Sequence, residues 1–296
     1  EGQSPAGPIL HPEGVQAFGQ VLQNPRLDPA FIELVLTLPS ETYLAEQLSV
    51  VDPLRIHQVR QAMRMQLARE LQPIWEQVYA THRTRGTFSI SVQAMGQRAL
   101  ANLALLHLCL SAVGHTDSDW PDQALHAFSR ATNMTDRMGA LQALVHAQHP
   151  HADQALSQFH QLFVHDELVI DKWFALQASA PDQDGSVLAQ VKQLMRHPDF
   201  QLRNPNRARS LISSFCQGNP AAFHRSDASG YVFWSERVIE IDAINPQVAA
   251  RLARAMDRWR KLAQPYQDAA REAIKRVAAK SDLSKDVREV VTRALQ

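Results

Sequence analysis

The helical spacing of apolar residues is the feature that most limits what this chain can fold into. From Asp52-Pro53 onward, apolar residues recur at steps of three to five along one segment that reaches Val78. This spacing places them on one face of a helix, and Asp followed by Pro is a typical helix start. Pro73 lies inside the segment, and we expect it to kink the helix rather than end it. The sequence therefore predicts long helices.

The rest of the chain also predicts helices, joined by short segments rich in Pro, Asp, Asn and Gly. A buried helix is expected over 94–113, apolar on most faces, and no run of alternating polarity is long enough for a convincing strand. The shorter helices are expected over 121–130, 134–148, 152–164, 168–179, 186–196, 205–216, 229–241, 246–262, 265–280 and 284–295. Paired helices of this length predict an all-α fold, an irregular superhelical stack of paired antiparallel helices of the armadillo or HEAT type.

Composition limits the classes of function. The 30 basic residues balance the 30 acidic ones, and this zero net charge disfavours nucleic-acid binding. Cys109 and Cys216 lie far apart in apolar stretches, which predicts buried thiols in a reducing compartment. No apolar run reaches membrane-spanning length. We expect residues 1–11 to form a flexible leader and 12–296 a single α-helical domain.

The sequence contains no complete catalytic motif. His165-Asp166-Glu167 begins somewhat like the zinc motif His-Glu-x-x-His, but the position four residues after His165 is Val169, so two histidines cannot share one ion there. The nucleophile motif Gly-x-Ser-x-Gly and the phosphate-binding Gly-Lys-Ser/Thr are also missing. We therefore predict no catalytic, cofactor-binding or metal-binding residue in this chain.

Helix starts of the type Asn-Pro stand out in the C-terminal half. They are Asn204-Pro205, Asn219-Pro220 and Asn245-Pro246. At such a start Asn caps the helix, and the free N–H groups of the first turn suit a carboxylate or carbonyl. Gln247 and Arg251 are four residues apart and share a helix face, whereas Arg207 and Arg209 are two apart and face differently. One of these two arginines is expected to pair with a carboxylate; simple capping plus surface arginines is the alternative.

Several ordered motifs carry a resemblance to a known family. They are Asn133-Met134-Thr135-Asp136, Asp171-Lys172-Trp173-Phe174, Asn204-Pro205-Asn206-Arg207, Asn219-Pro220-Ala221-Ala222-Phe223-His224, Gly230-Tyr231 and Asn245-Pro246-Gln247-Val248-Ala249. In this order they resemble the C-terminal domain of the bacterial aminopeptidase N family, alanyl aminopeptidases that are zinc metallopeptidases with a thermolysin-like catalytic domain. The resemblance runs from about residue 12 to residue 296.

The resemblance implies an armadillo-like domain that closes over a catalytic domain and walls an internal substrate cavity. By the match at 245–251, Gln247 would approach the pocket for the first side chain of the substrate, and Arg251 would face the same cavity. By the match at 206–209, Asn206 and Arg209 would also face it. The two arginines would then hold the C-terminal side of a peptide through its carbonyl or carboxylate oxygens.

The family's zinc motif and its Gly-x-Met-x-Asn motif are missing from this chain. The resemblance therefore implies a non-catalytic C-terminal domain, inactive alone, of a parent enzyme that carries zinc. Its expected partners are the catalytic domain of the same polypeptide and peptide substrates. The expected location is the bacterial cytoplasm, with peripheral attachment to the inner membrane as a further option. The alternative is a free-standing helical-repeat scaffold that binds peptides or proteins.

Overall fold

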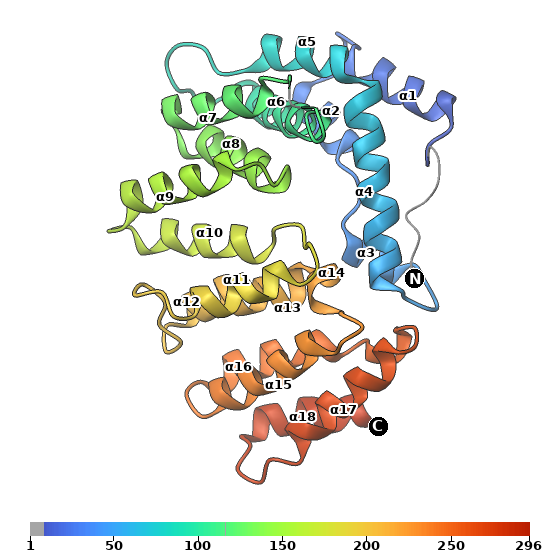
Figure 1. Cartoon of the computed structure of the whole chain (residues 1–296), viewed down its shortest axis with the longest axis vertical. Helices are drawn as coiled ribbons and strands as arrows, with labels where there is room; N and C mark the ends of the chain where they lie inside the picture. Colours follow the sequence, from blue (N-terminus) through green and yellow to red (C-terminus); the bar gives the residue numbers. More distant parts are fainter. Residues whose placement is uncertain (1–8, 116) are drawn as a thin grey trace. The chain divides into compact units, whose positions relative to one another are not determined.

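The computed structural model describes residues 9–115 and 117–296. Helices joined by short loops make up this part of the chain (Figure 1). Within it there is no β-strand, only an isolated parallel bridge between Val51 and Leu262. The predicted all-α helical repeat stack is confirmed. Residues 1–8 of the expected leader lie outside the described residues, and the first helix begins at Pro12.

The chain divides into two compact units, and each is described by itself. Unit 1 comprises Glu1–Ser40 and Gln58–Leu162, and unit 2 comprises Glu41–His57 and Phe163–Gln296. The prediction of a single domain over 12–296 stays a prediction. The helices that fall mainly in unit 1 are α1 (Pro12–Leu22), α2 (Pro29–Leu36), α4 (Pro53–Glu70), α5 (Gln72–His82), α6 (Val92–Ser111), α7 (Trp120–Arg130), α8 (Met134–His146) and α9 (His151–Phe163).

Unit 2 contains shorter helices. They are α3 (Glu41–Glu46), α10 (Glu167–Ala178), α11 (Ser186–Leu194), α12 (Pro205–Ala208), α13 (Ser214–Gly218), α14 (Pro220–Phe223), α15 (Ser229–Asp242), α16 (Pro246–Ala253), α17 (Tyr266–Ala278) and α18 (Lys285–Leu295). A π-helical turn, Arg209–Ser213, joins α12 to α13. The helix expected over 246–262 ends at Ala253 and is followed by two 3₁₀ turns, Arg254–Met256 and Trp259–Lys261.

Helix α6 forms the centre of unit 1, as expected for the apolar segment 94–113. Ser91 caps its start by accepting a hydrogen bond from the Ala94 N–H at 3.2 Å. Helices α2, α5, α7 and α8 all contact α6, and Figure 1 shows them around it. His107 is buried among them, where its ring stacks on Trp75 with a centroid distance of 4.2 Å and its Nδ1–H donates to the Leu103 carbonyl. A helix apolar on most faces can be stable only when it is surrounded in this way.

The prediction that Pro73 would kink one long helix is wrong. Helix α4 ends at Glu70, and α5 begins at Gln72 in a different direction (Figure 1). Leu71 leaves the helical region with φ −103° and ψ 13°. Pro73 lies in the first turn of α5. N–H groups in a first turn have no acceptor within the helix, so proline, which lacks this group, is tolerated there. Pro73 therefore lies at the start of a helix and does not bend one.

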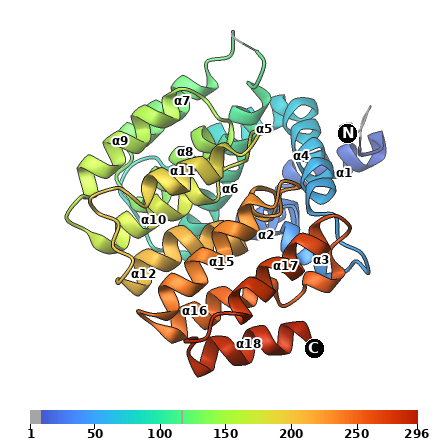
Figure 2. The same ribbon diagram turned by 60° about the horizontal axis from the view of Figure 1, so that its bottom comes forward.

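In unit 2, neighbouring helices hold one another in successive layers. Helix α15 contacts α16 and α17, while α18 contacts both α16 and α17. Figure 2 shows α16 and α18 side by side at the end of the layers. Asn204, Asn219 and Asn245 cap α12, α14 and α16, each with Pro in the first turn. The interpretation of all three Asn-Pro pairs as helix starts is confirmed.

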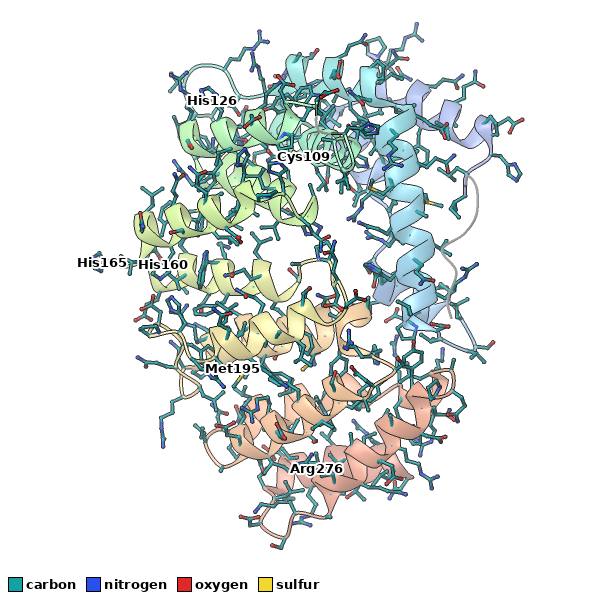
Figure 3. The ribbon with its side chains drawn as sticks, viewed as in Figure 1. Cys109, His126, His160, His165, Met195 and Arg276 are labelled. Carbon is teal, nitrogen blue, oxygen red and sulfur yellow. The ribbon has the colours of Figure 1, made fainter. Side chains whose placement is uncertain are left out.

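The two cysteines are buried free thiols, as the sequence predicts. Cys109 lies on α6 among the crowded side chains of unit 1 (Figure 3). Burial raises its pKa to about 12, so the thiolate that reacts or binds metals hardly forms. Among the described residues, no helix has both the length and the hydropathy needed to cross a membrane.

Candidate functional site

In the segment 204–209, two arginines that are close in sequence point in different directions. Asn204 starts α12 by accepting a hydrogen bond from the Asn206 N–H at 3.0 Å. Arg207 then points inward and is buried, with its Nη1 3.0 Å from an Asp171 carboxylate oxygen and its guanidinium over the Phe174 ring at 5.1 Å. Arg207 is therefore the arginine that pairs with a carboxylate, and its role is to hold α12 against α10.

Arg209 faces the other way and is exposed at the start of the π-helical turn. Its Nε–H donates to the Pro205 carbonyl at 3.1 Å, and its Nη2 donates to the Asn206 side-chain oxygen. These bonds fix the guanidinium near the helix start while leaving further N–H donors for a ligand. The structure therefore brings together two of the predicted cavity residues, Asn206 on α12 and Arg209 at the start of the π-helical turn. Such π-helical turns are frequent at functional sites.

Helix α16 presents the other two predicted residues. Asn245 caps it by accepting from the Val248 N–H at 3.2 Å. Val248 and Leu252 are buried on one face, and Gln247 and Arg251 are exposed on another. Because Gln247 and Arg251 lie one turn apart, both side chains can reach one extended ligand.

Two side-chain bonds attach α16 to the helices beside it. The indole N–H of Trp234, on α15, donates to the Leu252 carbonyl at 3.0 Å. The Gln217 side-chain amide, on α13, donates to the Arg251 carbonyl at 2.9 Å. The backbone that carries Arg251 is therefore held from two sides, which is what a positioned binding residue requires.

The predicted cavity residues are exposed at two places on unit 2. Asn206 and Arg209 lie on α12 and at the π-helical turn that follows it, and Gln247 and Arg251 lie on α16. Figure 2 labels both helices. Within 163–296, no hydrogen bond or ion pair joins Asn206 or Arg209 to Gln247 or Arg251. That all four line one substrate cavity stays a prediction.

A cavity of about 350 Å³ lies elsewhere in unit 2, and none of the four predicted residues lines it. Its apolar part includes Met256, Trp259 and Leu262, and an Arg258–Glu46 ion pair of 2.6 Å lies at it. The residues that line it come from 41–56, 216–224 and 254–262. Sequence reasoning missed this cavity because its walls are built from segments far apart in the chain, each ordinary by itself.

Unit 1 contains a hollow of about 720 Å³ between α5, α6, α7 and α8. Arg83, Arg130 and His126 line it, and Figure 3 labels His126 on α7. Two carboxylates also line it, but both have partners. Asp122 lies 2.8 Å from His151 Nε2, and Asp136 accepts from the Asn133 amide at 2.7 Å.

The segment 218–231, which contains α14 and the start of α15, uses its polar groups internally. His224 Nδ1 lies 2.8 Å from the Tyr231 hydroxyl, and burial lowers the pKa of His224 to about 4. A Cβ on Gly230 would lie 2.0 Å from the Phe223 carbonyl oxygen, so only glycine fits there. Arg225 pairs with Asp182 and Asp227, and nothing in this arrangement singles the segment out for a ligand.

The fold places the chain in the class of armadillo-type helical repeat proteins. Residues 6–296 match the family described as "Domain of unknown function (DUF3458_C) ARM repeats", and the chain belongs to this family.

The chain is also similar to proteins called aminopeptidase N. It is 37% identical to the one from Caulobacter vibrioides over 279 residues, which is 94% of this chain and 32% of that protein. It is 36% identical to the one from Haemophilus influenzae, over 97% of this chain and 32% of that protein. The Escherichia coli protein is 36% identical over 94% of this chain and 31% of its own length.

A solved structure has the same fold. The crystal structure of Legionella pneumophila aminopeptidase A in complex with aspartic acid matches with a TM-score of 0.86 and 26% identity, over 97% of this chain and 34% of that one. The chain thus spans about a third of the length of the relatives it matches, and it is homologous to the C-terminal region of aminopeptidase N.

Proposed function

We propose that this chain is the non-catalytic C-terminal domain of a zinc-dependent aminopeptidase that removes N-terminal residues from peptides. The observation that carries the proposal is the similarity of nearly the whole chain to only about a third of aminopeptidase N. In this proposal the zinc ion, its ligands and the catalytic residues belong to polypeptide outside this chain. The cytoplasmic location expected from the resemblance is part of the same proposal.

The domain would cap the active site and line the internal substrate cavity with the exposed patches of α12 and α16. Arg209 and Arg251 supply guanidinium N–H donors, which suit peptide carbonyl and carboxylate oxygens. The hydrogen bonds that fix Arg209 and the Arg251 backbone support this role, because an immobilised donor loses less conformational entropy on binding. Gln247, one turn before Arg251, would contact the first side chain of the substrate.

The proposed function is tested with the isolated chain and with the complete polypeptide that its reading frame encodes. Both are assayed on alanine p-nitroanilide with zinc and after chelation. We expect turnover by the complete polypeptide, loss of turnover on chelation, and none by the isolated chain. Turnover by the isolated chain, or a zinc-loaded complete polypeptide without peptidase activity, would contradict the proposal. The second result would favour a peptide-binding scaffold.

The cavity residues are tested in the complete polypeptide with Arg251→Ala, Arg209→Ala and Gln247→Ala. We expect Arg251→Ala to lower kcat/KM on tetrapeptides about tenfold, or about 1.4 kcal/mol, mainly through KM. The effect on alanine p-nitroanilide should be smaller because that substrate has no C-terminal extension. Gln247→Ala should change the ranking of substrates that differ in their first side chain. Arg276→Ala is the matched control, since this exposed arginine lies on α17 (Figure 3).

A further inference from the structure

Helix α2 in unit 1 is apolar on two faces, although only one of them is covered. Ile32 and Leu36 are buried on one face. Phe31, Leu34 and Val35 lie on another face and are exposed, with Leu34 72% accessible to solvent. A surface helix normally carries polar residues on its outer face, and a helix that is apolar all round is normally buried. The outer face of α2 therefore has the composition of a covered surface.

The segment 88–91 and the first turn of α6 carry further exposed apolar side chains. Phe88, Ile90, Val92 and Met95 are exposed, with Ile90 and Val92 each 79% accessible. The two segments adjoin each other, because a Cβ on Gly96 of α6 would lie 2.9 Å from the Ala30 backbone nitrogen of α2. We call the seven side chains of α2 and of this segment the α2 face; they are Phe31, Leu34, Val35, Phe88, Ile90, Val92 and Met95.

The α2 face is held in place before any partner binds. The Arg98 guanidinium donates to the Ser89 carbonyl at 2.8 Å and lies over the Phe88 ring at 4.8 Å. The Ser91 hydroxyl caps α6 directly after Ile90. These contacts fix the backbone of 88–91 while Ile90 stays exposed, so a partner would bind a preformed surface at a low entropic cost.

We propose that the α2 face is the surface on which the remaining two thirds of the polypeptide docks. This inference rests on the proposed function, because the relatives supply the occupant: in each of them the matching region is about a third of a longer chain. A domain of the same polypeptide is always present at high effective concentration, so a permanent apolar interface can be kept. Large exposed apolar side chains on adjoining elements are a mark of protein interfaces.

The α2 face carries little charge of its own. The only charged residue within α2 is Glu33, and the Arg98 guanidinium beside Phe88 is buried and donates to the Ser89 carbonyl. Depletion of charge is typical of the core of a protein interface. A second copy of the chain is the other occupant considered, and the experiment separates it from the proposed one.

The test uses thiol labelling, for which the two native cysteines give a silent background because both are buried. Leu34→Cys and Ile90→Cys report on the α2 face, and Ser281→Cys, at an exposed turn between α17 and α18, is the control. Each variant is made in the isolated chain and in the complete polypeptide, and the labelling rate at the engineered position is read by peptide mass spectrometry. We expect rates at least tenfold lower at Leu34→Cys and Ile90→Cys in the complete polypeptide, and rates within twofold at Ser281→Cys.

Equal labelling rates in both proteins would overturn the proposal. Slow labelling in the isolated chain, together with a dimer mass in light scattering, would also overturn it in favour of a second copy. Hydrogen exchange of the unmodified proteins is a second measurement that needs no substitution; amides of 29–36 and 88–96 should gain protection in the complete polypeptide. Protection of the α2 face without peptidase activity would leave the interface in place and contradict only the proposed function.

Discussion

Unit 1 and unit 2 pack their helices in different ways. Unit 1 surrounds one 20-residue helix, α6, with the helices α2, α5, α7 and α8. Unit 2 has no such centre: short helices hold their neighbours through caps, a buried ion pair and a close backbone contact at Gly230. Both units bury large apolar side chains, such as Trp75 and Phe128 in unit 1 and Phe215 and Trp234 in unit 2. They differ in arrangement, because one long helix organises the core of unit 1, whereas single polar contacts help to position the short helices of unit 2.

The largest expected effect comes from breaking the buried ion pair of unit 2. Arg207→Ala leaves the Asp171 carboxylate without its cation in a mostly buried position. We expect a loss of about 4 kcal/mol in the free energy of unfolding, measured by chemical denaturation. Arg209→Ala, two residues on but exposed, is the matched control and should cost less than about 0.5 kcal/mol. Similar losses in both variants would contradict the different roles assigned to the two arginines.

A slightly smaller effect is expected in the centre of unit 1. Leu108 on α6 is fully buried, so Leu108→Ala removes apolar contacts and leaves a cavity. The expected loss is about 3 kcal/mol in the same denaturation experiment. Leu168→Ala, at an exposed position of α10, is the control and should change stability little. A small effect of Leu108→Ala would show that α6 is not the centre of the core.

Both units should lose stability in mild acid for the same reason. Burial lowers the pKa of His107 in unit 1 and of His224 in unit 2 to about 4, from 6.5 for an exposed histidine. Between pH 6.5 and 4 the unfolded chain therefore binds protons that the folded chain does not, so stability is complete above pH 6.5 and falls as the pH drops. Each histidine should cost about 2 kcal/mol by pH 5.

Denaturation at pH 7.5 and pH 5 measures this loss. His107→Gln removes one titrating group, so the difference between the two pH values should shrink by about 2 kcal/mol. An unchanged pH dependence would contradict a neutral buried His107. The same variant loses the stacking on Trp75, and that cost appears at both pH values.

The smallest effect is expected at a helix cap of unit 2. Asn245→Ala removes the acceptor for the Val248 N–H at the start of α16 and should cost about 1 kcal/mol. Asn245→Asp keeps an acceptor and is the control, with a cost close to zero. The two variants are compared by thermal unfolding. Equal unfolding midpoints would show that the Asn245 cap does not stabilise α16.

Local patterns predicted what local physics decides. The Asn-Pro starts of α12, α14 and α16 were predictable because the cap and the helix it starts are a few residues apart. That Arg207 and Arg209 would point in different directions was predictable, because residues two apart on a helix face different sides. Pro73 misled because the apolar stripe continues through it, and only the geometry at Leu71 shows the break.

The candidate site could be predicted only in pieces. The four residues were named from motif resemblance, and that they line one cavity stays a prediction because no contact within 163–296 joins the residues of α12 and the π-helical turn to those of α16. The 350 Å³ cavity could not be predicted, since Val51 and Leu262 meet there without any pairing signal in the sequence. The α2 face could not be predicted for a similar reason: the sequence shows which residues are apolar, but not which of them the fold leaves exposed.

The bridge at Val51 also sets an order of events during synthesis on the ribosome. Val51 exchanges backbone hydrogen bonds with Lys261 and Ala263, and the Lys261 amine donates to the Leu48 carbonyl, 213 residues earlier. At roughly 5–20 residues per second, translation brings these partners out about 10 to 40 s after Leu48. For that interval the early segment of unit 2 has none of these partners, and a chain that stops before Lys261 would lack them altogether.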